Sequence, residues 1–132
     1  MRKVKEIMHT GNYNPTADKN CCFRDVLEIM NSKKLGVVCV IDAGKLIGII
    51  TDGDVRRLIL KTQDTLPELF MKNIQSIMNK NPKTVPPDTS FEDCLAQLEK
   101  YNIWVIPVVD NQKKLLGLVH LQTLLKAMVK SD

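Results

Sequence analysis

The feature that most constrains the fold of this chain is an internal repeat with an offset of about 70 residues. The matching segments are Ile7-Met8 with Ile77-Met78, Phe23-x-Asp25 with Phe91-x-Asp93, Val40-Ile41-Asp42 with Val108-Val109-Asp110, and Leu46-Ile47-Gly48 with Leu115-Leu116-Gly117. The offset changes by one residue in a turn between two strands, where an insertion costs little. A chain with such a repeat is expected to fold as two similar units. We assign residues 1–66 to the first repeat and residues 67–132 to the second.

Each repeat is predicted to contain the elements β-α-β-β-α after a short helical turn, which is an α+β, sandwich-like class of fold. The long helices are predicted from apolar residues at i, i+3, i+4 and i+7, and each strand pair, joined by a short turn, from the pattern of an antiparallel hairpin. In the first repeat we expect a turn at 4–8, a brief strand at 15–17, a helix from residue 23, strands at 36–41 and 46–50, and a helix at 54–61. In the second we expect a turn at 74–78, a brief strand at 83–85, a helix from residue 91, strands at 103–109 and 115–119, and a helix at 121–129. A further helical turn is expected at 67–71.

A single repeat of about 60 residues buries only part of its surface and is marginal alone. We therefore expect the two repeats to bury matching sheet faces against each other around a pseudo-twofold axis. The two corners at which the last strand turns into the last helix would then face one cleft.

The corner of the first repeat, residues 48–57, has the sequence Gly-Ile-Ile-Thr-Asp-Gly-Asp-Val-Arg-Arg. A buried strand there passes directly into a helix start, where free N–H groups and the helix dipole favour an anion. Thr51, Asp52, Asp54, Arg56 and Arg57 add a hydroxyl, carboxylates and guanidinium groups, the chemistry that a phosphorylated sugar or a nucleotide requires. The alternative is that Thr51 and Asp54 form only a capping box and that the arginines are solvated.

The composition and motif spacing of the chain argue against several classes of function. The net charge is +4 with scattered lysines, and aromatic residues make up 5%, which does not favour nucleic-acid binding. No apolar run approaches the ~20 residues that span a bilayer, and the first residues lead into no signal-peptide core. No Ser-His or Cys-His arrangement has a spacing that indicates a catalytic site, so the chain is not expected to be an enzyme by itself.

The cysteines and histidines indicate neither a disulfide framework nor a metal site. The four cysteines contain no C-x-x-C spacing, and Cys39 and Cys94, within apolar segments, are expected to be small buried hydrophobes. His9 and His120 are far apart in the sequence and lack metal-ligand spacing. We therefore expect reduced thiols, a cytoplasmic location and no bound metal.

The duplicated unit, with Gly-hydrophobic-hydrophobic-Thr-x-x-Asp after its last strand, resembles the cystathionine-β-synthase (CBS) domain pair, also called a Bateman module. The resemblance covers residues 4–128. It implies that Asp54 holds ribose hydroxyls, that Thr51 lies near the ribose or phosphate, and that backbone around Thr16-Ala17 and Thr84-Val85 contacts the base. It also implies a disc-like homodimer of two pairs.

A narrower resemblance concerns residues 7–11, 48–57, 78–84 and 119–121. These segments are similar to the C-terminal part of the sugar-phosphate isomerases that interconvert ribulose 5-phosphate and arabinose 5-phosphate. That family serves the synthesis of 3-deoxy-manno-octulosonate, a sugar of lipopolysaccharide and capsule. Its catalytic site lies in a preceding sugar isomerase domain, which would be the partner of this chain, and this chain would be the regulatory tail alone. No cofactor is required, and the ligand would be an adenine nucleotide, by the resemblance, or a cytidine-activated sugar, by the logic of the pathway.

The second repeat departs from this pattern because His120 replaces Thr51 and Thr123 replaces Asp54. Without that carboxylate its corner should hold a ribose poorly, so we expect one competent site or one of altered specificity. His120 is either a neutral, structurally bonded imidazole or a phosphate or sugar contact. The candidate ligand-binding residues are Thr16, Ala17, Thr51, Asp52, Asp54, Arg56, Arg57, Thr84 and His120. The leading hypothesis is a regulatory ligand-binding module, and the alternative is a purely structural module that only oligomerises the isomerase.

Overall fold

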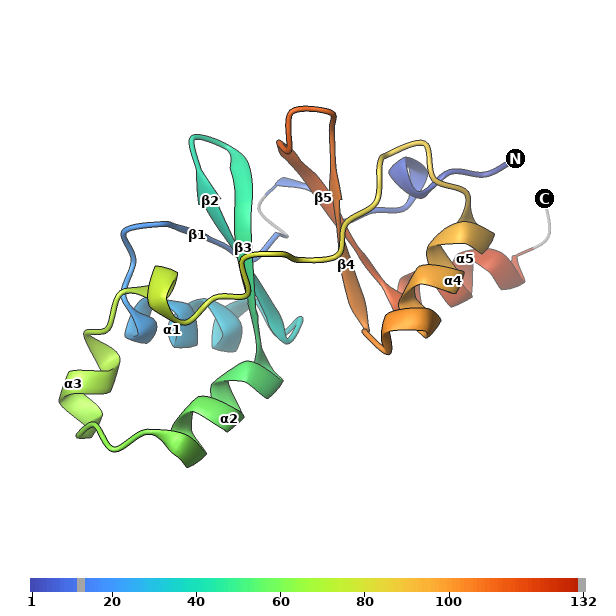
Figure 1. The fold of residues 1–132 in the computed structure, drawn as a ribbon. Coiled ribbons are helices and arrows are strands. Elements are labelled where there is room, and N and C mark those ends of the chain that lie inside the picture. The colour runs from blue at the N-terminus through green and yellow to red at the C-terminus, as the bar shows by residue number, and fades with distance from the viewer. Residues whose placement is uncertain (12–13, 131–132) are drawn as a thin grey trace. The chain divides into compact units, whose positions relative to one another are not determined.

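The computed structural model of the chain describes residues 1–11 and 14–130 (Figure 1). The last two residues assigned to the second repeat, 131–132, lie outside the described residues. The α+β class predicted from the repeat is confirmed. The elements are η1 (Val4–Glu6), β1 (Thr16–Asp18), α1 (Phe23–Lys33), β2 (Val37–Asp42), β3 (Lys45–Thr51), α2 (Asp52–Lys61), α3 (Leu66–Phe70), η3 (Ile74–Ser76), α4 (Phe91–Tyr101), β4 (Val105–Val109), β5 (Leu115–His120) and α5 (Leu121–Val129).

The chain forms two compact units. The three-strand unit, residues 15–82, contains β1, β2 and β3 in that order, with β1 parallel to β2 and β3 antiparallel to it. The central strand β2 has the apolar sequence Val-Val-Cys-Val at its start, and these four residues are buried because strands and helices cover them. The core contains Ala17, Val26, Val38, Val40, Ile50 and Ile74.

The two-strand unit consists of residues 1–14 and 83–132 and contains the β4–β5 hairpin. The brief strand expected at 83–85 is reduced to one parallel bridge between Val85 and Val108. Pro82 and the Pro86-Pro87 pair flank this bridge, and proline has no N–H with which to extend a strand ladder. The core contains Val4, Val85, Phe91, Cys94, Leu98, Ile106, Val108, Val119 and Leu124.

The two units exchange their leading turns. The turn η1 precedes the first repeat but lies in the two-strand unit, where Val4 is completely buried and His9 bridges Leu118. The turn η3 precedes the second repeat but lies in the three-strand unit, where Ile74 is completely buried and Asn79 bridges Ile49. The boundary at residue 66 therefore divides the sequence repeat, whereas each compact unit draws on both repeats. Both turns are 3-10 helices of three residues, shorter than the predicted segments.

This exchange explains the glycine in the last strand of each repeat. A Cβ atom on Gly48 would lie 2.5 Å from Met78 Sδ and 2.9 Å from the backbone oxygen of Asn79. A Cβ atom on Gly117 would lie 2.7 Å from the backbone oxygen of His9. The motif glycine is thus required because the exchanged segment crosses the strand at this point.

The closing helices of the two units differ in burial. Helix α5 packs against α4, with Leu124 fully buried (Figure 1). Helix α2 buries no residue completely, and Ile59 and Leu60 are 50% and 79% exposed. The apolar surface of α2 is therefore largely open within the described residues of its unit.

Candidate functional site

The corner between β3 and α2 is a complete capping box. The Thr51 hydroxyl accepts a hydrogen bond from the Asp54 N–H at 3.1 Å, and Asp54 Oδ2 accepts one from the Thr51 N–H at 3.0 Å. Two of the N–H groups that a helix start leaves unpaired are satisfied in this way. The capping box is therefore formed, and whether these two residues also bind a ligand stays a prediction. Any ligand must bind to residues that already hold the helix start.

Asp54 is also paired with Arg57. The Arg57 Nη2 atom donates to Asp54 Oδ1 at 2.6 Å, while the Arg57 side chain remains 59% exposed and that of Asp54 29% exposed. Partial burial raises the pKa of Asp54, but the hydrogen bonds from Thr51 and Arg57 outweigh it and hold that pKa below its usual value. Asp54 is therefore an ionised carboxylate at neutral pH. Within the described residues, Asp54 Oδ1 accepts one hydrogen bond from Arg57 and Oδ2 one from Thr51, and a carboxylate oxygen can accept two.

Asp52 and Arg56 stand on the same first turn but face solvent. The Asp52 N–H donates to the Gly36 carbonyl at 3.0 Å, which joins the end of α1 and the start of β2 to the corner. Gly36 has a left-handed φ of 73°, and the Asp52 carboxylate lies 3.2 Å from the position of a Cβ atom there. Both site residues are exposed, and Arg56 forms no ion pair with any residue that the structure describes.

Thr16 and Ala17 lie on β1, at the other side of the same sheet. Thr16 is in register with Cys39 of β2, and Cys39 is in register with Ile49 of β3. Thr16 and Ile49 thus lie about 10 Å apart, which is two strand spacings, and Thr51 follows two residues beyond Ile49. Thr16 is half-buried and Ala17 is buried. The three-strand unit therefore contains seven of the nine predicted site residues, namely Thr16, Ala17, Thr51, Asp52, Asp54, Arg56 and Arg57. Ala17 belongs to the core of that unit.

The corresponding corner of the two-strand unit is capped by a histidine. His120 Nδ1 accepts a hydrogen bond from the Gln122 N–H at 3.1 Å, so the imidazole replaces the threonine hydroxyl as the cap of α5. Burial, together with the nearby His9, lowers the pKa of His120. Both effects favour the neutral ring that this cap requires. His120 is therefore structurally bonded, and its role as a phosphate or sugar contact stays a prediction. Thr84 is exposed beside the Val85 bridge of the same unit.

The contact between His9 and Thr123 was not predicted from the sequence. His9 Nε2 lies 3.2 Å from Thr123 Oγ1, so the two histidines and the residue that replaces Asp54 gather at one corner. The repeat offered a signal, because Met8-His9 corresponds to Met78-Asn79 and each segment bridges the last strand of a unit. Recognising the exchange of turns would have placed His9 there.

No cluster of three or more histidine, cysteine or acidic residues that could hold a metal occurs among the described residues. Within those residues, no helix combines the length and the apolar character needed to cross a membrane. Cys39 and Cys94 are fully buried, as predicted, and burial raises the pKa of their thiols to about 12 and about 11. Neither thiol is therefore a nucleophile at neutral pH.

The duplicated α+β unit, with a Thr-x-x-Asp corner after the last strand of one copy, defines a tandem pair of small α+β domains. The chain belongs to the CBS domain family, whose profile matches residues 4–61 and 74–130. It is 36% identical over 126 residues to an uncharacterised protein, RP505, of Rickettsia prowazekii, and 34% identical over 128 residues to the arabinose 5-phosphate isomerase KdsD of Yersinia pestis. These matches cover 95% and 96% of the chain but only 37% and 38% of the relatives.

Solved structures of CBS pairs resemble the fold over nearly its whole length. CBSX2 in complex with AMP has a TM-score of 0.85 and 25% identity, with 98% of this chain and 97% of that chain covered. The CBS domain pair of protein MJ0100, in complex with 5-methylthioadenosine and S-adenosyl-L-methionine, has a TM-score of 0.81 and 26% identity, with 97% and 96% covered. The predicted recognition of a CBS pair is confirmed.

Proposed function

We propose that the chain is the regulatory part of an arabinose-5-phosphate isomerase and that the corner at the start of α2 binds an adenine nucleotide. The observation that carries this proposal is the arrangement of Thr51, Asp54 and Arg57. It joins an ionised carboxylate with spare acceptor capacity to an exposed guanidinium at a helix N-terminus. A carboxylate suits the two hydroxyls of a ribose, and an arginine suits a phosphate.

A bound nucleotide would displace the ion pair between Asp54 and Arg57. Exposed ion pairs contribute only about 0–1 kcal/mol, and the Arg57 side chain is 59% exposed. A nucleotide can therefore replace this pair at little cost, with ribose hydroxyls on Asp54 and the phosphate on Arg57. The Thr51 N–H keeps its bond to Asp54 Oδ2 during this exchange, so the helix cap is preserved.

Two of the structural relatives support an adenine-containing ligand, since CBSX2 was solved with AMP and the MJ0100 pair with two adenosine derivatives. The KdsD relatives are arabinose 5-phosphate isomerases and so support an isomerase as the parent protein. The pathway, 3-deoxy-manno-octulosonate synthesis, is what the resemblance of the sequence to that family implies. In that setting the CBS pair would act on a sugar isomerase domain. A cytidine-activated sugar is the alternative ligand to an adenine nucleotide. The four free thiols are consistent with a cytoplasmic protein.

A second candidate function is assembly without a ligand. It is favoured by the open apolar surface of α2, where Ile59 and Leu60 are exposed, and by the bonds that Asp54 already makes. Under this alternative α2 would bury its apolar surface in a homodimer of CBS pairs. Sedimentation of the chain with and without nucleotide tests it, because a purely structural module assembles identically in both.

Thermal unfolding in the presence of AMP, or of a cytidine-activated sugar, tests the ligand proposal. A ligand that binds only the folded state at 100 times its Kd stabilises by about 2.7 kcal/mol, which raises the melting temperature by several degrees. We expect Asp54→Asn to lose most of this stabilisation while keeping the cap, because the asparagine oxygen still accepts from the Thr51 N–H. The failure of every tested nucleotide and nucleotide sugar at millimolar concentration would contradict the proposal.

Asp64→Asn is the matched control. Asp64 belongs to the same unit, is paired with Lys72 at 3.4 Å, and lies outside the corner. Its replacement removes the same charge and a similar ion pair, so it should leave the nucleotide effect unchanged. Equal loss of the AMP effect in both variants would point to net charge rather than to the corner.

A further inference from the structure

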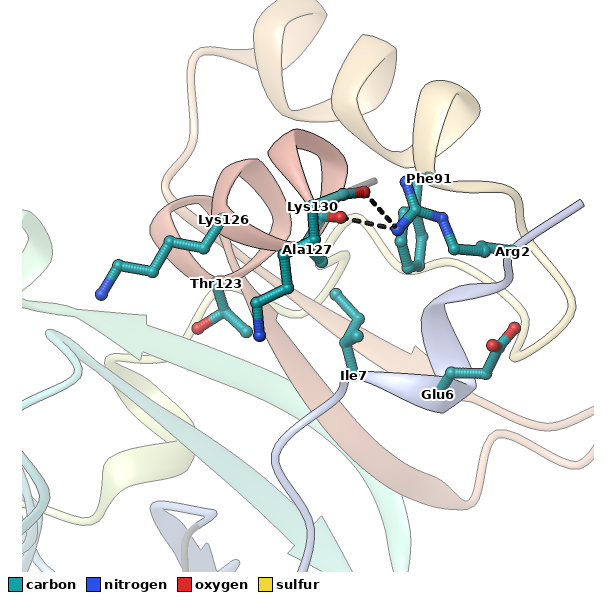
Figure 2. A pocket seen from close by; sticks show the side chains of 8 residues that line it. All are labelled: Arg2, Glu6, Ile7, Phe91, Thr123, Lys126, Ala127 and Lys130. Carbon is teal, nitrogen blue, oxygen red and sulfur yellow. Dashed lines mark hydrogen bonds between the residues drawn. The ribbon is translucent and has the colours of Figure 1, made fainter. Parts of the chain in front are cut away.

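The two-strand unit contains a cavity that the nucleotide proposal does not use. It has a volume of about 470 Å³ and lies between η1, the start of α4 and helix α5 (Figure 2). Its lining consists of Arg2, Glu6, Ile7, Phe91, Thr123, Lys126, Ala127 and Lys130. Cavities that bind small molecules commonly measure about 300–1,000 Å³.

One wall of the cavity is fixed by Arg2. Its Nη1 atom donates to the carbonyl oxygens of Ala127 and Lys130 at 2.7 and 3.4 Å, and its guanidinium lies 4.8 Å from the centre of the Phe91 ring (Figure 2). Arg2 thus satisfies carbonyls at the end of α5 and covers the buried ring. With Ile7 it forms an ordered, partly apolar wall.

The charge of the cavity is positive. Lys126 and Lys130 contribute two positive charges to the lining, and Glu6 contributes a carboxylate, which accepts a hydrogen bond from the Lys3 N–H at 2.7 Å. Among the residues that the structure describes, neither Lys126 nor Lys130 has an ionic partner. In Figure 2 the Lys130 side chain extends toward Thr123 and Ile7, whereas that of Lys126 extends outward past Thr123, and both ammonium groups lie away from the Arg2 guanidinium.

The repeat explains why these lysines are unpaired. By the offset of 69 residues, Lys126 corresponds to Arg57 and Thr123 to Asp54. In the three-strand unit the carboxylate of Asp54 neutralises Arg57. In the two-strand unit a threonine occupies that position and its hydroxyl contacts His9, so the cation one turn later has no carboxylate beside it. The loss of the carboxylate thus converts this corner from a pairing site into a site for an external anion.

We propose that this cavity binds a small organic monophosphate. The phosphate would contact Lys126 and Lys130, and the organic part would lie against Ile7, Phe91 and Ala127. The site is separate from the Asp54 corner and lies in the other unit, so it does not depend on nucleotide binding there. Phosphate is favoured over a carboxylate because two ammonium groups supply donors for several oxygens.

The test is a titration of the intact chain with phenyl phosphate, followed by NMR of backbone amides and methyl groups. We expect saturable shifts at Ile7, Thr123 and Ala127. The double variant Lys126→Gln with Lys130→Gln should weaken binding about tenfold or more, because charged hydrogen bonds are lost. The control Lys61→Gln removes the lysine that corresponds to Lys130 in the other repeat and should leave the affinity unchanged.

A second variant tests the argument from the repeat. Thr123→Asp restores the carboxylate of the first repeat, which should pair with Lys126 and abolish binding of phenyl phosphate, whereas Thr123→Ser should retain it. Amide spectra outside the cavity verify that both variants are folded. The proposal is overturned by the absence of saturable shifts at millimolar phenyl phosphate, by unchanged binding in Thr123→Asp, or by equally tight binding of phenol.

Discussion

The exchange of leading turns predicts which unit loses stability when a buried residue of a turn is shortened. The sequence repeat alone would predict the loss in the other unit. Ile74 belongs to the second repeat, yet it is completely buried in the core of the three-strand unit with Val26, Val38 and Ile50. Ile74→Ala should therefore destabilise the unit built on the first repeat. The hydrogen-bonded β2–β3 pair of that unit should lose protection against amide exchange.

The size of the effect follows from the burial of Ile74. Removing three carbons from a fully buried side chain loses about 0.8 kcal/mol for each one, or about 2.4 kcal/mol in transfer free energy. A cavity term is added because the Asn79 bridge to Ile49 and the packed strands limit collapse around the site. We expect a loss of about 3–4 kcal/mol in the free energy of unfolding, within the usual range for such changes. That is a large fraction of the ~5–15 kcal/mol that stabilises a typical domain.

Urea denaturation gives the total loss, and native-state hydrogen exchange shows where it falls. Ile59→Ala is the matched control, since it removes the same three carbons from a side chain that is 50% exposed, and should cost less than about 1 kcal/mol. Val4→Ala is the mirror experiment and should lower protection in β4 and β5. Selective loss of protection in β4 and β5 after Ile74→Ala would refute the exchange of turns.

Two further predictions concern the motif glycine and the histidine cap. Gly48→Ala should lower the free energy of unfolding, measured in urea, by about 1–3 kcal/mol. The reason is that its Cβ would lie 2.9 Å from the backbone oxygen of Asn79. An unchanged free energy of unfolding would show that the exchanged segment moves freely. The pKa of His120 is lowered below the 6.5 of a free imidazole, so the folded state binds fewer protons there than the unfolded state. Stability should therefore fall as the pH drops from 6.5 through the pKa of His120 in the folded state. His120→Asn, which keeps a cap acceptor but does not titrate, should flatten this decline, and unchanged pH dependence would contradict it.

The order of the elements could be predicted from the sequence because the repeat supplied each one twice. Helix α5 agrees with its predicted bounds of 121–129, where an apolar periodicity meets a strand end. Helix α2 begins at Asp52, two residues earlier than predicted. Its N-cap is Thr51, and the first helical residue directly follows the N-cap. The brief strand at 83–85 was overestimated: only Val85 bridges β4, and the prolines on both sides prevent a longer ladder.

The exchange of turns and the contacts that depend on it could not be predicted from periodicity. Periodicity reports which face of an element is buried but not which neighbour covers it. Val4 and Ile74 each lead a repeat, so local patterns assign them to the repeat that follows. The contact between His9 and Thr123 spans most of the chain, and no local rule brings such residues together.

The two corners cap their helices with different side chains and differ in the charge beside the cap. In the first repeat one Asp54 oxygen closes the capping box and the other pairs with Arg57. In the second repeat His120 caps the helix alone, so Thr123 is released from any capping role and contacts His9. The carboxylate is therefore not needed to cap α5, and its absence does not by itself favour a purely structural module. Each repeat keeps a capped helix start while the charge beside it differs, so we expect the two corners to differ in ligand preference.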